Sequence, residues 1–452
     1  MRVGIIGGGA AGLGAAYELT LHGHTPEVFE RAPVLGGQAS TFNVGGTPLE
    51  RGYHHLFRSD TAMTGLMDEL GLGDRLRWID SNVGYFHGER IWRFTTPFDL
   101  LRFRPLNMVD RVRLGLVTLY LQRRKEWHSL EQHTASEWTR RWAGERVYQV
   151  IFEPMLRGKF GTYFDQVSMA WLWNKFALRT SSRGKGIRGA MKEQLGYPMG
   201  SFGEIFDTLG KRIEQGGGQV HTKAAVERVV VEDGRAVGLE VRLDGTEPQR
   251  YDYDAIIATV PSYILPQLVP PLPDGYLKRL TDVVYLAAVL VVLVLDRPLT
   301  PTYWMYVGDR SIPFLGVIEH TNLIPAEHYG GNHVVYLSNY LEKDDPLHRM
   351  SGEELFQHYL THLKRLNPQF APSWVREYHY HREEAAQPVV TRGYSARIPD
   401  HHTPIPRLYL ANTTQIYPED RGTNYSVRLG RQVARVLHAD QGGAPEPPPE
   451  PA

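Results

Sequence analysis

Three glycines near the start of the chain have the spacing of a phosphate-binding turn. Gly7, Gly9 and Gly12 follow a short apolar run at residues 3–6 and lead into a segment with helical apolar spacing. In such a turn the first glycine allows the bend, the second lets the backbone approach a pyrophosphate, and the third lets the helix pack on the strand. The N–H groups and the positive dipole end of that helix then face the phosphates. These residues predict that the chain binds a dinucleotide.

An acidic residue ends the second predicted strand, at residues 25–30. Glu30 stands 18 residues after Gly12, where a carboxylate can accept hydrogen bonds from ribose hydroxyls and disfavours a 2′-phosphate. The glycine turn and this acid do not by themselves distinguish NAD from FAD. The residues of this unit that we expect to contact the dinucleotide are Gly7, Gly9, Ala10, Ala11, Gly12, Glu30 and Arg31.

Two later segments carry side chains that can move a proton. His54 lies in RGYHHLF, and an imidazole titrates near neutrality, so it can act as an acid or as a base. Glu319 and His320 interrupt the apolar segment GVIEHTN, and a charged residue on a sheet that faces a cleft needs a partner or a function. We predict catalytic roles for these three residues. The alternatives are a histidine that only hydrogen-bonds the backbone and a turn at the edge of a sheet.

The segment IYPEDRGTNYSVRLG, residues 416–430, combines charged residues, glycines and an Asn-Tyr pair just before a predicted helix. Surface turns rarely need so much specific chemistry. A helix N-terminus stabilises negative charge, and Arg421 adds a positive charge beside it, so we predict that this residue is catalytic as well. Asp420 has no such explanation and is a candidate for substrate recognition. The alternative is a surface turn that leads into an amphipathic helix.

Composition limits the chemistry that the chain can do without a cofactor. The 452 residues suffice for two or three domains with a large core. Acidic and basic residues balance at 50 each, which gives no argument for a nucleic-acid partner. The absence of cysteine excludes disulfides, thiolate metal sites and a cysteine nucleophile. We therefore expect no metal site, and a cofactor must carry any electrons that the protein transfers.

The sequence shows neither a signal peptide nor a segment that would span a membrane. The first predicted strand begins at Arg2, directly after the initial methionine. The longest apolar run, residues 283–295, has 13 residues, whereas a spanning helix needs about 20. Its β-branched content favours a buried strand. We expect a cytoplasmic protein with a disordered tail at residues 439–452, which are rich in proline, glycine and glutamate.

After Glu30 the chain continues RAPVLGGQAST, with Gly36 and Gly37 a short distance from the acid. Here the sequence resembles the large family of FAD-dependent amine oxidases, protoporphyrinogen oxidases and phytoene desaturases, and more distantly the UDP-galactopyranose mutases. The resemblance implies that the cofactor is FAD and that the Gly-Gly backbone passes close to its ribityl chain and phosphates. Only glycine allows such an approach. Gln38 stands where many members of the family have arginine.

The resemblance also implies cofactor contacts from later segments. Gly52 and His54 match a Gly-x-His pattern of the mutases, which would place the imidazole beside flavin N5. The strand in KAAVERV would lie against the adenine, and the closing segment would present a helix start to the flavin. Asn412 stands where the family usually has an acid for the ribityl chain. The implied contacts are Gly36, Gly37, Gln38, Gly52, Tyr53, His54, Val226, Asn412, Arg421, Thr423, Asn424 and Tyr425.

We expect an α/β fold in which a Rossmann-like FAD-binding domain of the glutathione-reductase type carries an inserted α+β substrate domain. The first insertion reads as helical, and its basic and apolar residues suit either a core helix with solvated arginines or a helix at a membrane surface. The predicted boundaries are 1–60, 196–262 and 396–438 for the FAD-binding domain and 61–195 and 263–395 for the substrate domain.

The resemblance implies an oxidoreductase in which flavin N5 accepts a hydride equivalent from a small or lipophilic molecule, such as an amine, a polyene or a porphyrinogen. The electron acceptor, the oligomeric state and contact with a membrane surface stay open. One alternative is a mutase-like enzyme without net redox chemistry, which would grip a sugar-nucleotide diphosphate. The arginines available for that grip are Arg51, Arg157, Arg392 and Arg421. The other alternative is a flavin-binding protein without catalysis.

Overall fold

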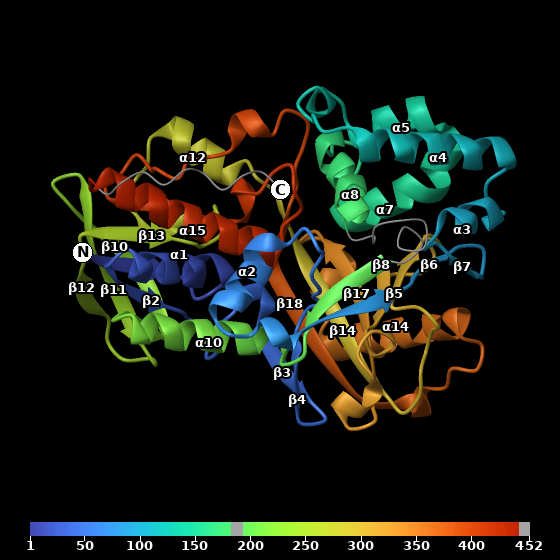
Figure 1. Ribbon diagram of the computed structural model, residues 1–452, viewed down its shortest axis with the longest axis horizontal. Helices are drawn as coiled ribbons and strands as arrows, with labels where there is room; N and C mark the ends of the chain where they lie inside the picture. The colour runs from blue at the N-terminus through green and yellow to red at the C-terminus, as the bar shows by residue number, and fades with distance from the viewer. Residues whose placement is uncertain (182–192, 443–452) are drawn as a thin grey trace.

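The computed structural model describes residues 1–181 and 193–442 and shows two large sheets at opposite ends of an elongated molecule (Figure 1). The first sheet has five strands in the order β19-β13-β1-β2-β9, and every pairing in it is parallel. Its central strands read as unbroken apolar runs because both of their faces are covered. The strands are β1 (Arg2–Ile6), β2 (Thr25–Phe29), β9 (Gln219–His221), β13 (Ala255–Ala258) and β19 (Leu408–Leu410).

Helices cover one face of the parallel sheet, and a small antiparallel sheet covers the other. Ile5, Val28 and Ile257 pack against the helices, whereas Ile6 and Ile256 pack against the three-stranded sheet. The helices are α1 (Ala10–Leu21), α10 (Ser201–Gln215) and α15 (Thr423–Asp440), with α2 (Thr61–Glu69) beside them. The small sheet consists of β10 (Ala224–Glu232), β11 (Arg235–Leu243) and β12 (Gln249–Asp252). This layered arrangement confirms the predicted α/β class.

The second large sheet has seven strands in the order β18-β14-β17-β16-β15-β6-β7 and is antiparallel except for the pair β6 and β15. The apolar run that we predicted as a buried strand is β14, an interior strand that pairs with β18 on one side and β17 on the other. Helix α14 (Gly352–Leu366) packs on the face away from the parallel sheet. The strands are β6 (Val83–Phe86), β7 (Ile91–Arg93), β14 (Tyr285–Leu295), β15 (Trp304–Val307), β16 (Gly316–Glu319), β17 (His333–Leu341) and β18 (Val375–Pro388).

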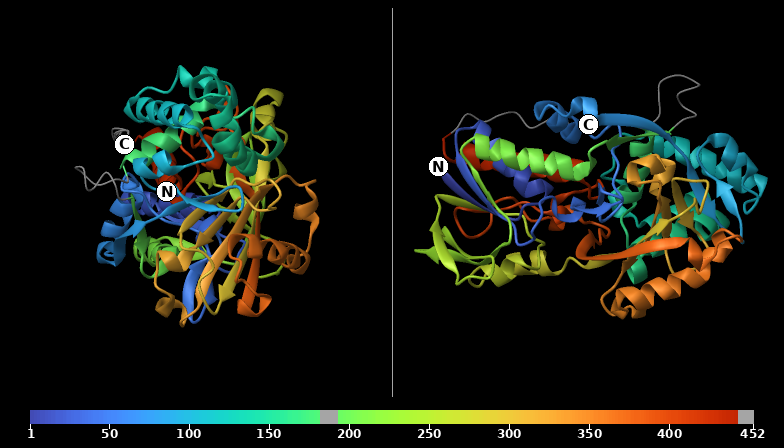
Figure 2. Two further views of the ribbon diagram at one scale, coloured as in Figure 1. Left: turned by 90° about the vertical axis from the view of Figure 1, so that its right-hand side faces the viewer. Right: turned by 90° about the horizontal axis from the view of Figure 1, so that it is seen from below.

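A cluster of helices forms the top of the same end of the molecule, around its own apolar core (Figures 1 and 2). The first insertion is therefore helical as expected, but it also supplies β6 and β7, whose short runs give too little alternation to be recognised as strands. The helices are α3 (Pro97–Arg102), α4 (Met108–Arg123), α5 (Ala135–Ala143), α6 (Glu145–Val147), α7 (Glu153–Phe160) and α8 (Met169–Ser181).

Short elements connect these parts. They are β3 (Thr41–Val44), β4 (Thr47–Glu50), β5 (Leu76–Ser81), β8 (Glu193–Pro198), α11 (Leu265–Leu268), α12 (Asp274–Thr281) and α13 (Pro346–Arg349). Of the predicted disordered tail, the part from residue 443 onward lies outside the described residues. Within residues 1–181 and 193–442, every helix is too short or too polar to cross a lipid bilayer.

Candidate active site

Two glycine segments meet at the edge where the parallel strands end. The Gly36 N–H donates to the Gly8 carbonyl at 2.9 Å, and Gly9 forms a β-bridge with Gly36. A Cβ atom added to Gly37 would lie 3.1 Å from the Gly9 Cα, and the φ of Gly37 is +55°. The two backbones come this close because neither glycine carries a side chain. Such a bare backbone cradle suits the pyrophosphate and ribityl chain of FAD.

Helix α15 brings the closing segment to the same edge by packing on α1. A Cβ atom on Gly430 would lie 2.0 Å from the Ala11 carbonyl oxygen, and one on Gly14 would lie 3.1 Å from the Val427 carbonyl oxygen. Further along, Glu18 accepts hydrogen bonds from arginines of α15. Beyond this crossing point His24 Nε2 lies 2.9 Å from His438 Nδ1, which brings the C-terminal ends of both helices together, so α1 and α15 run in broadly the same direction. Both N-termini therefore present N–H groups and positive dipole ends to one site.

Glu30 organises the site for the nucleotide half of the cofactor. Its carboxylate accepts the Gly8 N–H at 2.7 Å and the Ala32 N–H at 2.8 Å. The Ala224 N–H donates to the Glu30 carbonyl at 2.8 Å, which places the start of β10, and with it Val226, beside the end of β2. A carboxylate offers about four lone-pair positions, so Glu30 can still accept from ribose hydroxyls. Arg31 is exposed beside it.

A set of polar side chains surrounds the buried Asp420, between the start of α15 and helices α7 and α8. We call this set the Asp420 cluster. The Asp420 carboxylate accepts from four side chains of three different elements. They are Lys159 of α7 at 2.9 Å, Lys175 and Trp171 of α8, the latter at 3.2 Å, and Gln387 of β18 at 3.4 Å. The carboxylate thus fixes α7, α8 and β18 relative to the start of α15.

Arg421 extends the Asp420 cluster to the Gly-Gly segment and to the seven-stranded sheet. Its guanidinium donates to the Tyr340 hydroxyl at 2.8 Å, the Gln38 side-chain oxygen at 3.1 Å and the Gln387 side-chain oxygen at 3.2 Å. Gln38 thus orients an arginine from the other end of the chain. Arg421, which we predicted to be catalytic, therefore places a fixed positive charge next to the N-terminus of α15.

The Asp420 cluster holds three cationic side chains, Lys159, Lys175 and Arg421, and one carboxylate. Burial alone would raise the pKa of Asp420, but these three cations outweigh it and hold the pKa well below its usual range. Burial lowers the pKa of Lys175 to about 8, against the opposing attraction of Asp420. Burial also opposes ionisation of Tyr340, yet Arg421 and Lys159 lower its pKa to about 8. The cluster therefore favours negative charge in its centre.

We expect a phenol of the folded protein to titrate near pH 8, far below the ordinary tyrosine value of 10.0, and this phenol is Tyr340. Ionisation of Tyr340 then stabilises the fold fully above pH 10, and this contribution is lost as the pH falls through about 8. Phenolate absorbance measured against pH should show this step, Tyr340→Phe should remove it, and Lys159→Met should raise its midpoint. A titration with no step below the ordinary tyrosine range would contradict the assignment.

His54 lies beside the same region in a defined protonation state. Its Nδ1 lies 2.6 Å from the Gly52 carbonyl, which can only accept, so Nδ1 carries the proton and Nε2 is an acceptor. Burial lowers the pKa of His54 to about 4, the Gly52 carbonyl opposes this, and Arg421 adds to it. At neutral pH the imidazole is therefore neutral, and its Nε2 can accept a hydrogen bond. Next to it, the ring of Tyr53 contacts Trp304 edge-on, with centroids 4.7 Å apart.

Glu319 and His320 lie away from the Asp420 cluster. Glu319 shares its side of β16 with Val317, which packs toward α14, and its carboxylate accepts from Leu299 N at 3.0 Å and from Thr300. His320 is buried, and its Nε2 lies 2.7 Å from the Tyr329 hydroxyl. The strand register thus directs Glu319 to the face opposite the cofactor side. Both side chains are used by the fold, and this geometry does not support their predicted catalytic roles.

The polar residues of the closing segment are also used to build the site. Both amide protons of Asn412 are engaged, with the Val260 carbonyl at 3.0 Å and the Ser262 hydroxyl at 3.1 Å. The side-chain oxygen of Asn424 accepts the Met63 N–H at 3.0 Å and so holds the start of α2. Any flavin contact from this segment, as predicted, would therefore have to come from backbone N–H groups at the start of α15. The residues there are Thr423, Asn424 and Tyr425.

Sequence reasoning missed the contribution of α8. Lys175 and Trp171 lie one helical turn apart in WLWNK, which reads as an ordinary core helix. Arg157, one of the arginines considered for a diphosphate grip, instead pairs with Glu153 at 3.0 Å. Within the part of the chain that the structure describes, no set of three acidic or histidine side chains is arranged to hold a metal ion.

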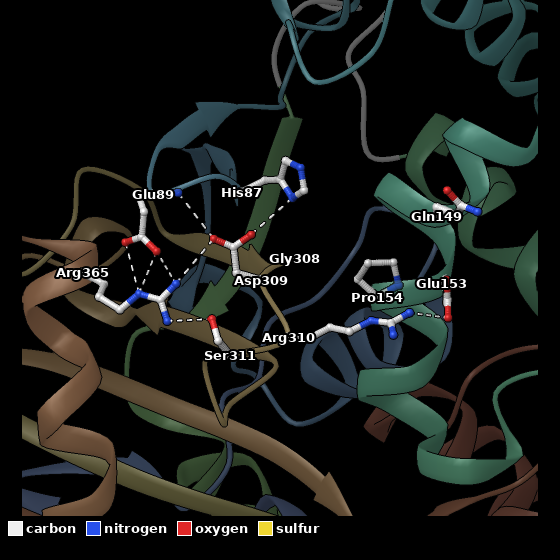
Figure 3. Close-up of a pocket in the computed structure, with 10 residues that line it drawn as sticks. All are labelled: His87, Glu89, Gln149, Glu153, Pro154, Gly308, Asp309, Arg310, Ser311 and Arg365. Carbon is white, nitrogen blue, oxygen red and sulfur yellow. Dashed lines mark hydrogen bonds and ion pairs between the residues drawn. The ribbon is translucent and has the colours of Figure 1, made fainter.

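A separate depression of about 620 Å³ opens between α7 and the loop that follows β15 (Figure 3). Its charged groups are paired with one another: Asp309 contacts His87 and Arg365, and Arg310 contacts Glu153. None of the residues that line it belongs to the Asp420 cluster or to the glycine cradle. The depression is therefore distinct from the candidate active site.

Two curated proteins resemble this chain in sequence, and one solved structure resembles it in fold. The 15-cis-phytoene desaturase of Synechococcus elongatus is 24% identical over 473 residues, which cover 98% of this chain and 96% of that protein. The 15-cis-phytoene desaturase of Glycine max is 24% identical over 392 residues, and the chain matches 81% of its own length but 66% of that longer protein. A crystal structure from Exiguobacterium sp. 255-15, described as a candidate protoporphyrinogen oxidase, has a TM-score of 0.75 at 21% identity, covering 97% of this chain and 99% of that one.

A family model that matches most of the sequence identifies the family. The model of the family described as flavin containing amine oxidoreductase matches residues 10–438, which include the Gly36-Gly37 segment and the whole Asp420 cluster. The cradle formed by Gly9 and Gly37 and the paired N-termini of α1 and α15 fit the FAD that this family name implies. The chain therefore belongs to the flavin-containing amine oxidoreductases, with FAD as its cofactor.

Proposed function

We propose that this FAD-dependent oxidoreductase dehydrogenates a lipophilic organic substrate at a C–H bond next to the Asp420 cluster. When bound, FAD supplies a hydride acceptor at N5. The observation that carries the proposal is the position of Arg421, which links the Gly-Gly segment, the seven-stranded sheet and the start of α15 through three hydrogen bonds. A fixed cation at this junction favours the negative charge that accompanies reduction.

The residues around this junction have complementary tasks. The N-terminus of α15 and Arg421 stabilise negative charge, since their positive ends are oriented before the reaction begins. His54, neutral at pH 7, can accept a hydrogen bond at Nε2 and has no proton to give from that atom. The aromatic residues beside it exclude water and offer an apolar wall to a substrate. They are Tyr53, Trp304, Tyr336 and Tyr340.

A polyene is the substrate class that we favour among those considered. Both curated relatives named above are phytoene desaturases, and aromatic walls accommodate an extended apolar chain. Amines and porphyrinogens remain the next candidates. Of the four arginines named for the mutase-like alternative, Arg421 lies in the Asp420 cluster, whereas Arg157 pairs with Glu153.

The proposal is tested by anaerobic reduction of the holoenzyme. We expect the flavin absorbance to bleach when a polyene such as phytoene in detergent is added, and to return when dioxygen or a quinone is admitted. Bleaching by amines alone would replace the polyene with an amine substrate. Turnover of a sugar nucleotide only after dithionite reduction would establish the mutase-like alternative, and retention of oxidised flavin with every donor would support binding without catalysis.

A further inference from the structure

The exposed large apolar side chains of this protein are concentrated on one surface. Ten such side chains occur among the residues that the structure describes, and nine of them lie on α3, α4 and α5. We call this surface the α4 face, and it consists of Phe98, Leu101, Met108, Val109, Val112, Leu116, Leu119, Tyr120 and Trp142. A monomeric protein rarely leaves so many neighbouring apolar side chains in water unless they bind something.

Helix α4 is apolar on both of its sides. Leu114, Val117 and Leu121 are buried against the helical cap, whereas Val109 is 75% exposed and Leu116 is 64% exposed on the outer side. A helix that is apolar all round is ordinarily enclosed by protein or by lipid. Figures 1 and 2 show α3, α4 and α5 on the outside of the molecule, at the end opposite the parallel sheet.

Hydrogen bonds lock the three helices into one rigid surface. The Arg111 guanidinium donates to the Leu106 carbonyl of the α3–α4 turn at 2.8 Å. The Arg113 guanidinium donates to the carbonyls of Arg141 and Trp142 in α5, at 2.7 and 2.6 Å. The outer side of α4 is therefore held in its exposed position by bonds to both neighbours. This surface does not depend on a loosely placed helix.

Basic residues surround the apolar side chains. Residues 97–125 contain seven lysines and arginines and two aspartates, of which Asp99 is buried, in a chain whose overall charges balance. The exposed basic residues are Arg102, Arg104, Arg113, Arg123 and Lys125. Apolar and aromatic side chains ringed by lysine and arginine are the pattern of a helix that lies in the interface of an anionic bilayer.

We propose that the α4 face docks on the surface of a membrane that contains anionic lipids, with α4 lying in the plane of the interface. Charge complementarity favours this occupant over a second copy of the chain. A symmetric dimer through the same surface would bring two sets of seven basic residues together, and like charges oppose such contact. The inference is independent of the substrate proposed above, because it concerns where the protein binds.

The test measures binding of the holoenzyme to vesicles by sedimentation. We expect binding to vesicles of equal parts phosphatidylcholine and phosphatidylglycerol, and weaker binding at high salt or to phosphatidylcholine alone. Leu116→Glu should weaken binding by about tenfold or more, because a charge is placed at the centre of the inserted surface. Leu21→Glu is the matched control, since Leu21 is 57% exposed but lies at the end of α1, and it should bind as the native protein does.

A second readout follows the surface itself. The chain has no cysteine, so Leu116→Cys and Leu21→Cys each give a single site for a polarity-sensitive dye. We expect the dye at residue 116 to shift to shorter wavelengths with anionic vesicles and the dye at residue 21 to stay unchanged. The proposal is overturned if the native protein does not bind anionic vesicles or if Leu116→Glu binds them as well as the native protein does. It is also overturned if the dyes at residues 116 and 21 show the same spectral shift. Concentration-dependent dimers that Leu116→Glu dissociates, without vesicle binding, would assign the surface to a second copy instead.

Discussion

Replacing Gly430 by alanine is expected to remove the FAD from the purified protein and to lower its free energy of unfolding by about 3 kcal/mol or more. The added Cβ would lie 2.0 Å from the Ala11 carbonyl oxygen, which is backbone and cannot rotate away. Helix α15 must then move off α1, and its N-terminus leaves the edge where the glycine cradle lies. Flavin retention is measured from visible absorbance, and stability from urea unfolding.

Gly65→Ala provides the control for helix propensity. Gly65 also lies inside a helix, α2, and a Cβ added there meets nothing within 4 Å. Both substitutions gain up to about 1 kcal/mol of propensity in a helix interior, so the difference between them isolates the contact with Ala11. We expect Gly65→Ala to keep its flavin with equal or greater stability. A Gly430→Ala protein that matched it in both respects would show that α1 and α15 are not held as described.

Replacing Asp420 by asparagine is expected to lower the free energy of unfolding at pH 7 by up to about 3–5 kcal/mol, because three partly exposed cations packed around this buried carboxylate would lose their counter-charge. Asparagine keeps the shape of the side chain and can still accept hydrogen bonds, so the loss reports the charge. The folded protein would then favour neutral Lys175 more strongly, and its stability would rise with pH as Lys175 loses its proton. Urea unfolding across the pH range measures both effects.

The interpretation of Asp420→Asn rests on two comparisons. Asp252→Asn removes an exposed carboxylate that pairs with Arg250, and we expect a change within about 0.5 kcal/mol. Adding Lys175→Met to Asp420→Asn removes one of the uncompensated cations, so the double variant should be more stable than the sum of the single effects by about 1 kcal/mol or more. Simple additivity would mean that the two charges do not interact in the folded protein.

Much of the nucleotide site follows from local chemistry and could be predicted. The turn at Gly7, Gly9 and Gly12 and the acid Glu30 serve fixed tasks over short distances, and the structure places Gly36 and Gly37 against them. The apolar run that forms β14 was equally readable, because a buried strand needs a continuous apolar segment wherever it lies. These features depend on neighbours in sequence, and each residue type has few alternative uses.

The sequence by itself determined the dinucleotide turn, the layered fold class and the presence of a charged turn before the last helix. Only the tertiary structure decided which charges meet there, since Asp420 recruits Lys159 and Lys175 from helices hundreds of residues earlier. The tertiary structure also decided the place of Glu319, because a strand directs alternate side chains to opposite faces and the register assigns the faces. The physical reason is that burial and charge pairing depend on which residues are close in space. A local stretch of sequence contains only one of the two residues that form each such contact.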